Sequence, residues 1–320
     1  MSLLSLEHLQ NEEAAYAWVE ARIWPNGAQC PHCFEKTRLS KMQGKATRFG
    51  LYKCYACRKQ FRVTVGTIFE KSHVPLYMWL QAFYLVAGSK KGISSNQLHR
   101  TLGVTLKTAW FMGHRIREAM RAGSLAPPMG GAGEVVEVDE TVYGRASTHP
   151  KGRSKFKSSQ HKNVILSLVK RGGEVRSYHV TGANVAEVIP IVEANVHKET
   201  AVMTDAAQLY KRNLGGFASH DRVDHSAGEY VRDEEGKPLI HSNSVEGYFS
   251  VFKRGMRGTY QHCSEKHLHR YLAEFDFRYN NRVKLGVGDE QRAAKMVKGA
   301  QGKRLTYRTT DRKVSGDAEA

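Results

Sequence analysis

The sequence has no long apolar run and no leader-like start. Its longest apolar stretch, Leu76 to Ala87, is too short to span a bilayer and includes Gln81. The first residues carry Glu7 and Glu12 and lack a basic region, so they do not resemble a secretory signal peptide. These two absences predict a cytoplasmic protein.

Cysteine and acidic residues are also scarce. Five cysteines in 320 residues, in a chain expected to be cytoplasmic, do not predict a disulfide framework. The 31 acids are outnumbered by 49 Lys and Arg, which leaves a net charge of +18. That surplus indicates a polyanionic partner, and double-stranded DNA is the simplest one. A hydrophobic content of 41% excludes disorder throughout the chain.

Apolar periodicity and turn signals predict a multidomain α+β protein. The expected parts are an N-terminal helix plus ribbon (1–71), a helical DNA-binding segment (72–123), a Pro/Gly linker (124–134), a strand-rich domain (135–283) and a basic tail (284–320). Helices are expected over 5–24, 184–196, 241–257 and 265–283, and strands over 134–144, 162–171, 174–182 and 200–205. A short helix is expected to open at Asp289, and 314–320 to be disordered.

Four cysteines form two C-x-x-C pairs, Cys30 with Cys33 and Cys54 with Cys57. Two such turns complete a closed tetrahedral Cys₄ site, so we predict a zinc ribbon with one structural Zn²⁺. Cys263 has no partner in this pattern. Between residues 41 and 71 the ribbon is strongly basic, which predicts phosphate contacts. The ribbon residues expected to contact DNA are Lys53, Arg58 and Lys59.

Residues 94–121 have helix-turn-helix spacing. Ser94–Leu102 predicts one short helix, and Gly103 begins the turn. Thr105 can cap a second helix that runs to about Arg121 and is expected in the major groove. A helical hairpin without DNA contact is the alternative. The residues expected to contact DNA here are Lys107, Thr108 and Arg115.

Three acids far apart in the sequence predict a site for a hard cation. Asp139 lies within an apolar strand run, Asp205 ends another, and Glu246 lies in the helix expected over 241–257. Mg²⁺ accepts carboxylates from separate elements, so the three acids can share one or two ions. Each acid alone is equally well explained as a solvated or ion-paired residue. Strand alternation places Glu140 on the face opposite Asp139.

Two residues compete for the third position. Asn243, Glu246 and Lys253 share one helix face, because their spacing is three and seven residues. Glu246 offers the charged, harder oxygen. Asn243 can instead cap the first turn of the helix, or position the helix or a DNA phosphate. Lys253 suits a DNA phosphate. Asp221, Asp224 and His225 are expected in loops.

Several stretches carry a family resemblance. They are WPNGAQCPHC (24–33), YKCYACRKQF (52–61), VVEVDETVYG (135–144), VMTDAAQLY (202–210), the long block 241–282, and GKRLTYR (302–308). Together they resemble the insertion-sequence transposases that have an N-terminal zinc ribbon and an ISXO-like DDE catalytic domain. The resemblance implies an RNase H-like α/β catalytic fold and DNA strand transfer dependent on Mg²⁺ or Mn²⁺. It puts the first two acids at Asp139 and Asp205 and the basic residue at Lys253. Family members carry Asn or Glu at the third position, so Asn243 and Glu246 both stay open.

This reading predicts a transposase that binds terminal inverted repeats. Water would free a 3′-hydroxyl, which would then attack target DNA, in a complex of at least two chains. Two other classes stay open. A zinc-ribbon regulator with an inactive domain would bind DNA without the three acids. A structure-selective nuclease would cut DNA without joining strands.

Overall fold

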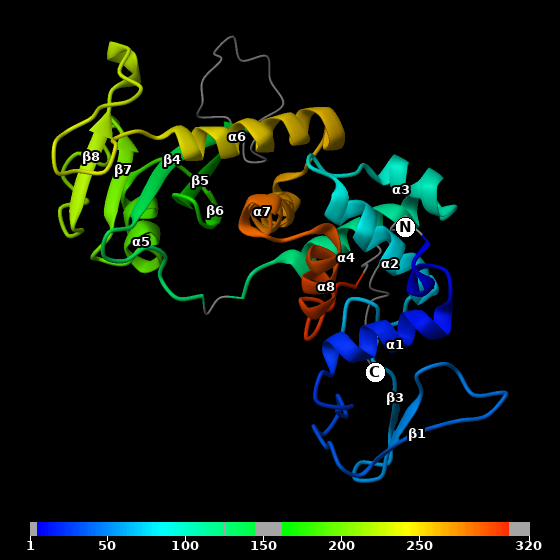
Figure 1. Ribbon diagram of the computed structural model, residues 1–320. Coiled ribbons are helices and arrows are strands. Elements are labelled where there is room, and N and C mark those ends of the chain that lie inside the picture. The colour runs from blue at the N-terminus through cyan, green and yellow to red at the C-terminus, as the bar shows by residue number, and fades with distance from the viewer. Residues whose placement is uncertain (1–4, 124–125, 145–161, 307–320) are drawn as a thin grey trace, which may run out of the picture.

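The structure, a computed structural model, describes residues 5–123, 126–144 and 162–306. A small ribbon, a helical module and a sheet domain follow one another along the molecule (Figure 1). Part of the predicted linker (124–125), the basic segment 145–161 and the tail from 307, including the disorder predicted for 314–320, lie outside the described residues.

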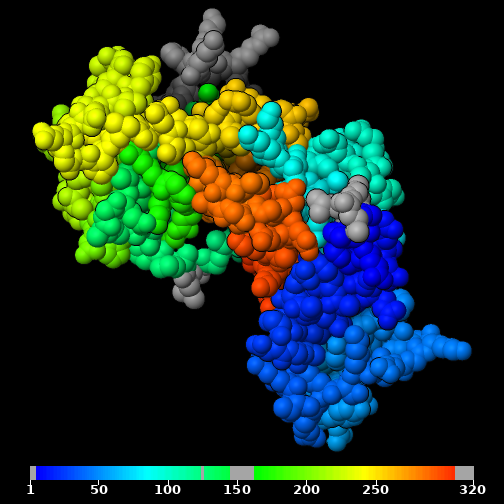
Figure 2. Space-filling model, in the orientation of Figure 1, coloured from blue at the N-terminus to red at the C-terminus, as the bar shows by residue number. Residues whose placement is uncertain are grey.

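The ribbon is a three-stranded antiparallel sheet that projects from the rest of the molecule (Figure 2). Its strands are β1 (Leu39–Lys41), β2 (Tyr52–Cys54) and β3 (Gln60–Phe61). The Trp24 ring packs edge-on against Tyr52 and Phe61, at centroid distances of 5.5 and 5.9 Å. These rings supply the apolar packing that so short a sheet otherwise lacks.

The helical module gathers both ends of the described chain around one core. Its helices are η2 (Glu7–Leu9), α1 (Glu12–Ile23), α2 (Leu76–Gly88), α3 (Ser95–Leu102), α4 (Leu106–Met120) and α8 (Asp289–Lys298). The helix expected over 5–24 is broken, because the Asn11 side chain accepts a hydrogen bond from the Ala14 N–H and starts α1 anew. Glu12 accepts the N–H groups of Leu76 and Tyr77, and so caps α2 from outside.

The helix pair expected over 94–121 is present. Ser94 and Thr105 cap α3 and α4, and Gly103 has the left-handed φ of +66° that ends α3. Part of the segment predicted as a basic tail belongs to this helical module. Helix α8 begins at Asp289 as expected, but its Met296 and Val297 are buried in the same core as α1, α2 and α4.

The sheet domain is a five-stranded mixed sheet in the order β6-β5-β4-β7-β8. The strands are β4 (Val135–Tyr143), β5 (Asn163–Lys170), β6 (Val175–Val180), β7 (Ala201–Asp205) and β8 (Ser219–Val223). Strands β4, β5 and β6 pair antiparallel, whereas β7 runs parallel to both β4 and β8. The parallel β4–β7 pairing extends from Val135–Ala201 to Glu137–Met203, so the carboxyl end of β7 lies beside the middle of β4.

Helices cover both faces of this sheet. Helix α5 (Val185–Asn195) packs on one face, with Val164, Leu166 and Leu168 of β5. Helices α6 (Asn243–Gly255) and α7 (Glu265–Asn280) pack on the other face, with Ile165 and Val169. The remaining helical turns are η4 (His225–Ala227), the π-helical η5 (Met256–Tyr260) and η6 (Val283–Leu285).

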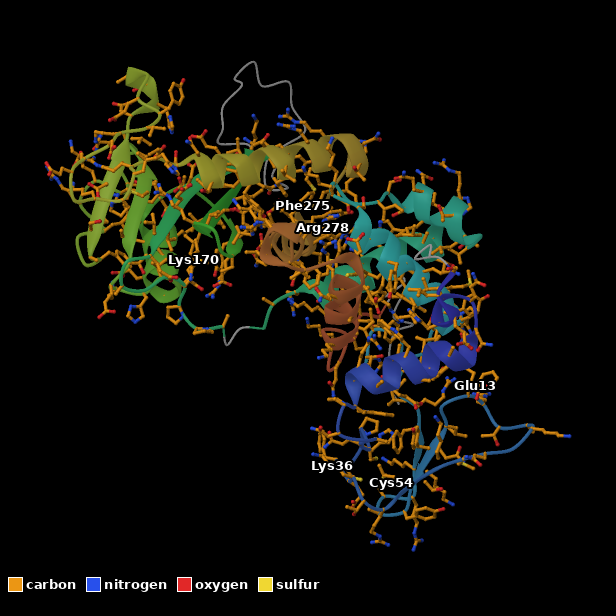
Figure 3. The ribbon with its side chains drawn as sticks, viewed as in Figure 1. Glu13, Lys36, Cys54, Lys170, Phe275 and Arg278 are labelled. Carbon is orange, nitrogen blue, oxygen red and sulfur yellow. The ribbon has the colours of Figure 1, made fainter. Side chains whose placement is uncertain are left out.

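Helix α7 joins the sheet domain to the helical module (Figure 1). Toward the sheet, Asn280 exchanges hydrogen bonds with the Val175 backbone and protects the edge strand β6. Toward α4, the buried Glu274 carboxylate lies 2.6 Å from the Arg117 Nε and also pairs with Arg278. Arg278 and Phe275 lie at this junction in Figure 3. Buried pairing of this kind holds the two parts together.

Candidate active site and zinc site

The four ribbon cysteines converge at one point. The Sγ atoms of Cys30 and Cys57 are 3.7 Å apart, and those of Cys33 and Cys54 are 3.6 Å apart. All four sulfurs lie within 4.8 Å of one another. A tetrahedral Zn²⁺ with Zn–S bonds of about 2.3 Å needs sulfurs about 3.8 Å apart. The cluster therefore fits a structural zinc ion, as the spacing predicted.

Backbone turns after each C-x-x-C pair bring these sulfurs together. Phe34 and Arg58, which directly follow the two pairs, have left-handed φ values of 62° and 61°. The Phe34 N–H donates to the Cys30 carbonyl, and the Cys57 N–H points at the Cys54 sulfur. The Cys54 side chain lies in the ribbon interior (Figure 3).

Two of the three predicted acids lie on adjacent parallel strands. The β4–β7 register pairs Val135 with Ala201 and Glu137 with Met203, so continuing it sets Asp139, in the middle of β4, beside Asp205 at the end of β7. Polar groups on adjacent strand ends of an α/β sheet are the usual place for a ligand site. The sheet therefore brings together two acids that are 66 residues apart in the sequence.

The environment of Asp139 is strongly unfavourable to its charge. Burial, and then the nearby carboxylate of Asp205, raise its pKa to about 7, and Glu246 adds to the rise. Lys253 lies close enough for Asp139 to favour its charged form, although burial and Arg257 lower the Lys253 pKa overall. A cluster of carboxylates that repel one another in a partly buried site is the donor set that a divalent cation stabilises.

Glu246 lies in the first turn of α6 and is held by two neighbours. Its Oε1 is 2.9 Å from the His225 Nε2 and accepts a hydrogen bond of 3.1 Å from the Ser242 hydroxyl. Asn243 is the first residue of α6 and is exposed; the N-cap is Ser242, so Asn243 does not cap the helix. Both competitors for the third position thus lie at the start of one helix.

The acids approach one another less closely than the cysteines do. Across residues 5–123, 126–144 and 162–306, the cysteines are the one group of three or more His, Cys, Asp or Glu with all ligand atoms within 4.8 Å. Glu246 is turned toward His225 instead of lying in contact with the two aspartates. Glu140 points to the opposite face, as alternation predicted, where it accepts a hydrogen bond from the Tyr210 hydroxyl.

The residues expected to contact DNA lie in different environments. Arg58, Lys59 and Lys107 are exposed, and the Lys53 ammonium lies over the Tyr55 ring at 5.7 Å. The half-buried Thr108 has its hydroxyl 2.9 Å from that of Thr105.

Arg115 does not lie on the groove-facing surface that the pattern predicted. It is 7% exposed, and its guanidinium donates to the backbone carbonyls of Ile68, Glu70 and Leu305. The reason is that this side of α4 packs against residues 68–70, which follow the ribbon, and against Leu305. The Arg115 guanidinium therefore makes hydrogen bonds within the helical module.

Sequence reasoning missed three features near the acids. Asp221 lies in β8 and not in a loop. The sequence does not indicate this parallel edge strand, because Val223 is its one strongly apolar residue. His225 contacts Glu246, although nothing in its sequence surroundings indicates this. Glu137 is wholly buried beneath the start of α6; an acid between two valines was its available signal.

Comparison with known proteins identifies two domains. Residues 131–280 match the ISXO2-like transposase domain, and residues 10–60 match the transposase zinc-ribbon domain. The chain therefore contains an ISXO2-like transposase domain and a transposase zinc ribbon. It is also 26% identical, over 270 residues, to an uncharacterized protein in transposable element ISH50 of Halobacterium salinarum; the match covers 80% of this chain and 86% of that protein.

The domain matches fall where the two candidate sites lie. The zinc-ribbon match contains all four cysteines, and the ISXO2-like match contains Asp139, Asp205 and Glu246. Among the described residues of this chain, no helix has the length and apolar character needed to cross a membrane.

Proposed function

We propose that this protein binds the ends of a mobile DNA element, cleaves them and joins them to target DNA. The observation that carries the proposal is that Asp139, Asp205 and the start of α6 come together where the β4–β7 pairing ends, in a chain with both transposase domains. The strand order β6-β5-β4-β7-β8, with three antiparallel strands followed by two parallel ones, supports an RNase H-like catalytic domain.

The chemistry of the donor set fits Mg²⁺ or Mn²⁺. Asp139 and Asp205 would hold the ion, with Glu246 as the third ligand and Asn243 as its competitor. Such ions activate water and stabilise the charge that develops on a phosphodiester. Lys253, two turns along α6, would hold a phosphate of the DNA strand beside the acids. No side-chain nucleophile is needed, because water and a 3′-hydroxyl serve in turn.

The ribbon and the α3–α4 pair are proposed to bind the element's terminal repeats. Exposed Arg58 and Lys59 beside the second C-x-x-C turn would contact phosphates. The first turn of α4, which carries Lys107 and Thr108, would enter the major groove as in a helix-turn-helix. Arg115 is left out of this surface. Two element ends must meet, so the active complex would contain at least two chains.

The decisive experiment incubates the purified protein with labelled DNA that carries the inverted repeats flanking its gene. With Mg²⁺, we expect both nicked donor strands and strands joined to target DNA. Binding without any cleavage, unchanged in Asp139→Ala, would favour a regulator. Cleavage without joining would favour a nuclease.

A further inference from the structure

Helix α6 begins in the interior of the protein without a cap of its own. Its N-cap, Ser242, is buried and makes no side-chain hydrogen bond to the helix backbone. The Ser242 hydroxyl donates to Glu246 instead. Since the first N–H groups of any α-helix have no partner within the helix, those of α6 need an acceptor from elsewhere.

Glu137 supplies that acceptor from strand β4. Its Oε2 accepts the N–H groups of Ser244 and Val245, at 2.7 and 3.0 Å. Its Oε1 accepts the Ser244 hydroxyl at 2.9 Å and the Arg171 Nε at 2.7 Å. The Glu137 side chain is wholly buried, so water cannot replace these bonds. A negative charge at this position is also favoured by the helix dipole.

Arg171 extends the same contact to the loop that leads into α6. Its two Nη atoms donate to the carbonyls of Leu239 and His241, at 2.5 and 2.8 Å. The Glu137–Arg171 pair therefore fixes both the first turn of α6 and the residues just before it.

We propose that Glu137 is a positioning residue that holds Glu246 and Asn243 in place relative to Asp139. Glu137 and Asp139 are two residues apart on β4 and so share the face beneath α6. One strand thus presents a metal ligand and the cap of the helix that carries the third ligand. This role deepens the proposed function and rests on it for its consequence in catalysis.

Replacement by glutamine makes the proposal testable. A glutamine has one acceptor oxygen. Its NH₂ group would face either the α6 N–H groups or, on the other side, the Arg171 Nε, the Ser244 hydroxyl and the His241 Nδ1; the α6 N–H groups and the Arg171 Nε are donors that would lose their acceptor. Glu137→Gln should therefore release part of the clamp at nearly constant volume. We expect faster amide hydrogen exchange at Ser244 and Val245 in metal-free full-length protein.

Loss of positioning should also weaken the metal site without changing DNA affinity. For Glu137→Gln we expect Mn²⁺ affinity, measured by titration without DNA, to fall about 10- to 100-fold, the usual effect of losing a group that orients a ligand. DNA cleavage should fall at low Mn²⁺ and recover at high Mn²⁺. Terminal-repeat affinity should stay within about twofold of the wild-type value, because the acids act on rate.

Glu12→Gln is the matched control, since Glu12 likewise accepts two N–H groups at the start of α2. It should lower the melting temperature and leave Mn²⁺ affinity and the exchange of Ser244 unchanged. If Glu137→Gln behaves as Glu12→Gln does, with stability lost and Mn²⁺ affinity intact, the positioning role is wrong. If wild-type protein binds Mn²⁺ at these residues but never cuts DNA, the proposed function fails, while the exchange data still decide the role of Glu137.

Discussion

The ribbon thiols and the carboxylates proposed to bind Mg²⁺ differ in how closely the fold brings them together. The four sulfurs already lie at the separations that Zn²⁺ requires. The carboxylates come from two strands and a helix, and Glu246 is hydrogen-bonded away from the aspartates. Four protein ligands around one ion suit a structural site. Fewer protein ligands, which leave coordination positions open, suit an ion that must also bind substrate.

The largest effect is expected in the ribbon. Cys54→Ala should abolish the one zinc per chain and unfold the ribbon, because zinc binding by such sites supplies about 10–16 kcal/mol of folding free energy. The sheet domain should stay folded, since its core shares no residue with the ribbon core. Zinc analysis and limited proteolysis measure both effects. Cys263→Ala is the control and should keep its zinc; a zinc-free protein with an intact ribbon would contradict the closed-site assignment.

Substitution of an acid at the sheet should lower the rate of DNA cleavage and leave the protein folded. Asp139→Asn should lower DNA cleavage about 1,000-fold or more, because the ion it holds supplies several kcal/mol of transition-state stabilisation. Affinity for the terminal repeats should change little. Asp221→Asn, in β8 of the same sheet and paired with Lys237, is the matched control and should still cleave. Normal cleavage by Asp139→Asn would refute the site.

The third ligand should give the next largest effect. Glu246→Gln should lower cleavage about 100-fold and raise the Mg²⁺ concentration needed, because a neutral amide is the weaker ligand. Asn243→Ala should lower it less than about 10-fold. Single-turnover cleavage over a range of Mg²⁺ concentrations separates the two. The opposite ranking would make Asn243 the ligand and leave Glu246 as the partner of His225.

The contrast also explains what the sequence could and could not reveal. Cysteine spacing is local, so it predicts the ribbon site completely. The helix caps at Ser94 and Thr105 are local as well, and α3 and α4 follow the predicted bounds closely. The environment of Arg115 depends on how α4 packs against residues 68–70 and Leu305. Glu137 and His225 acquire their roles only when β4, η4 and α6 meet. Such long-range packing leaves no spacing signal in the sequence.

The raised pKa values of two buried acids should make the metal-free protein less stable as pH rises. Burial raises the pKa of both Asp139 and Glu140 to about 7, with Asp205 contributing in each case. Between about pH 4 and pH 7 the folded chain therefore binds more protons than the unfolded chain, and the free energy of unfolding falls. Melting temperatures measured from pH 5 to 8 without Mg²⁺ should decline less steeply for Asp139→Asn than for wild type. Equal slopes would contradict the raised pKa. Zinc content must be checked at each pH, so that ribbon unfolding is not mistaken for this effect.

The smallest effect is expected on DNA binding, where Lys107 and Arg115 of α4 should differ. Lys107→Ala should weaken DNA binding about 3- to 10-fold and reduce the slope of log affinity against log salt by about 1, as expected for one lost phosphate contact. Arg115→Ala should leave that slope unchanged, because its guanidinium is bonded to three backbone carbonyls in the interior. It should instead lower the melting temperature, since one buried and two partly buried carbonyls lose their donor. Both variants are measured by fluorescence anisotropy at several salt concentrations and by thermal unfolding. A reduced salt slope for Arg115→Ala, with unchanged stability, would place Arg115 on the DNA surface after all.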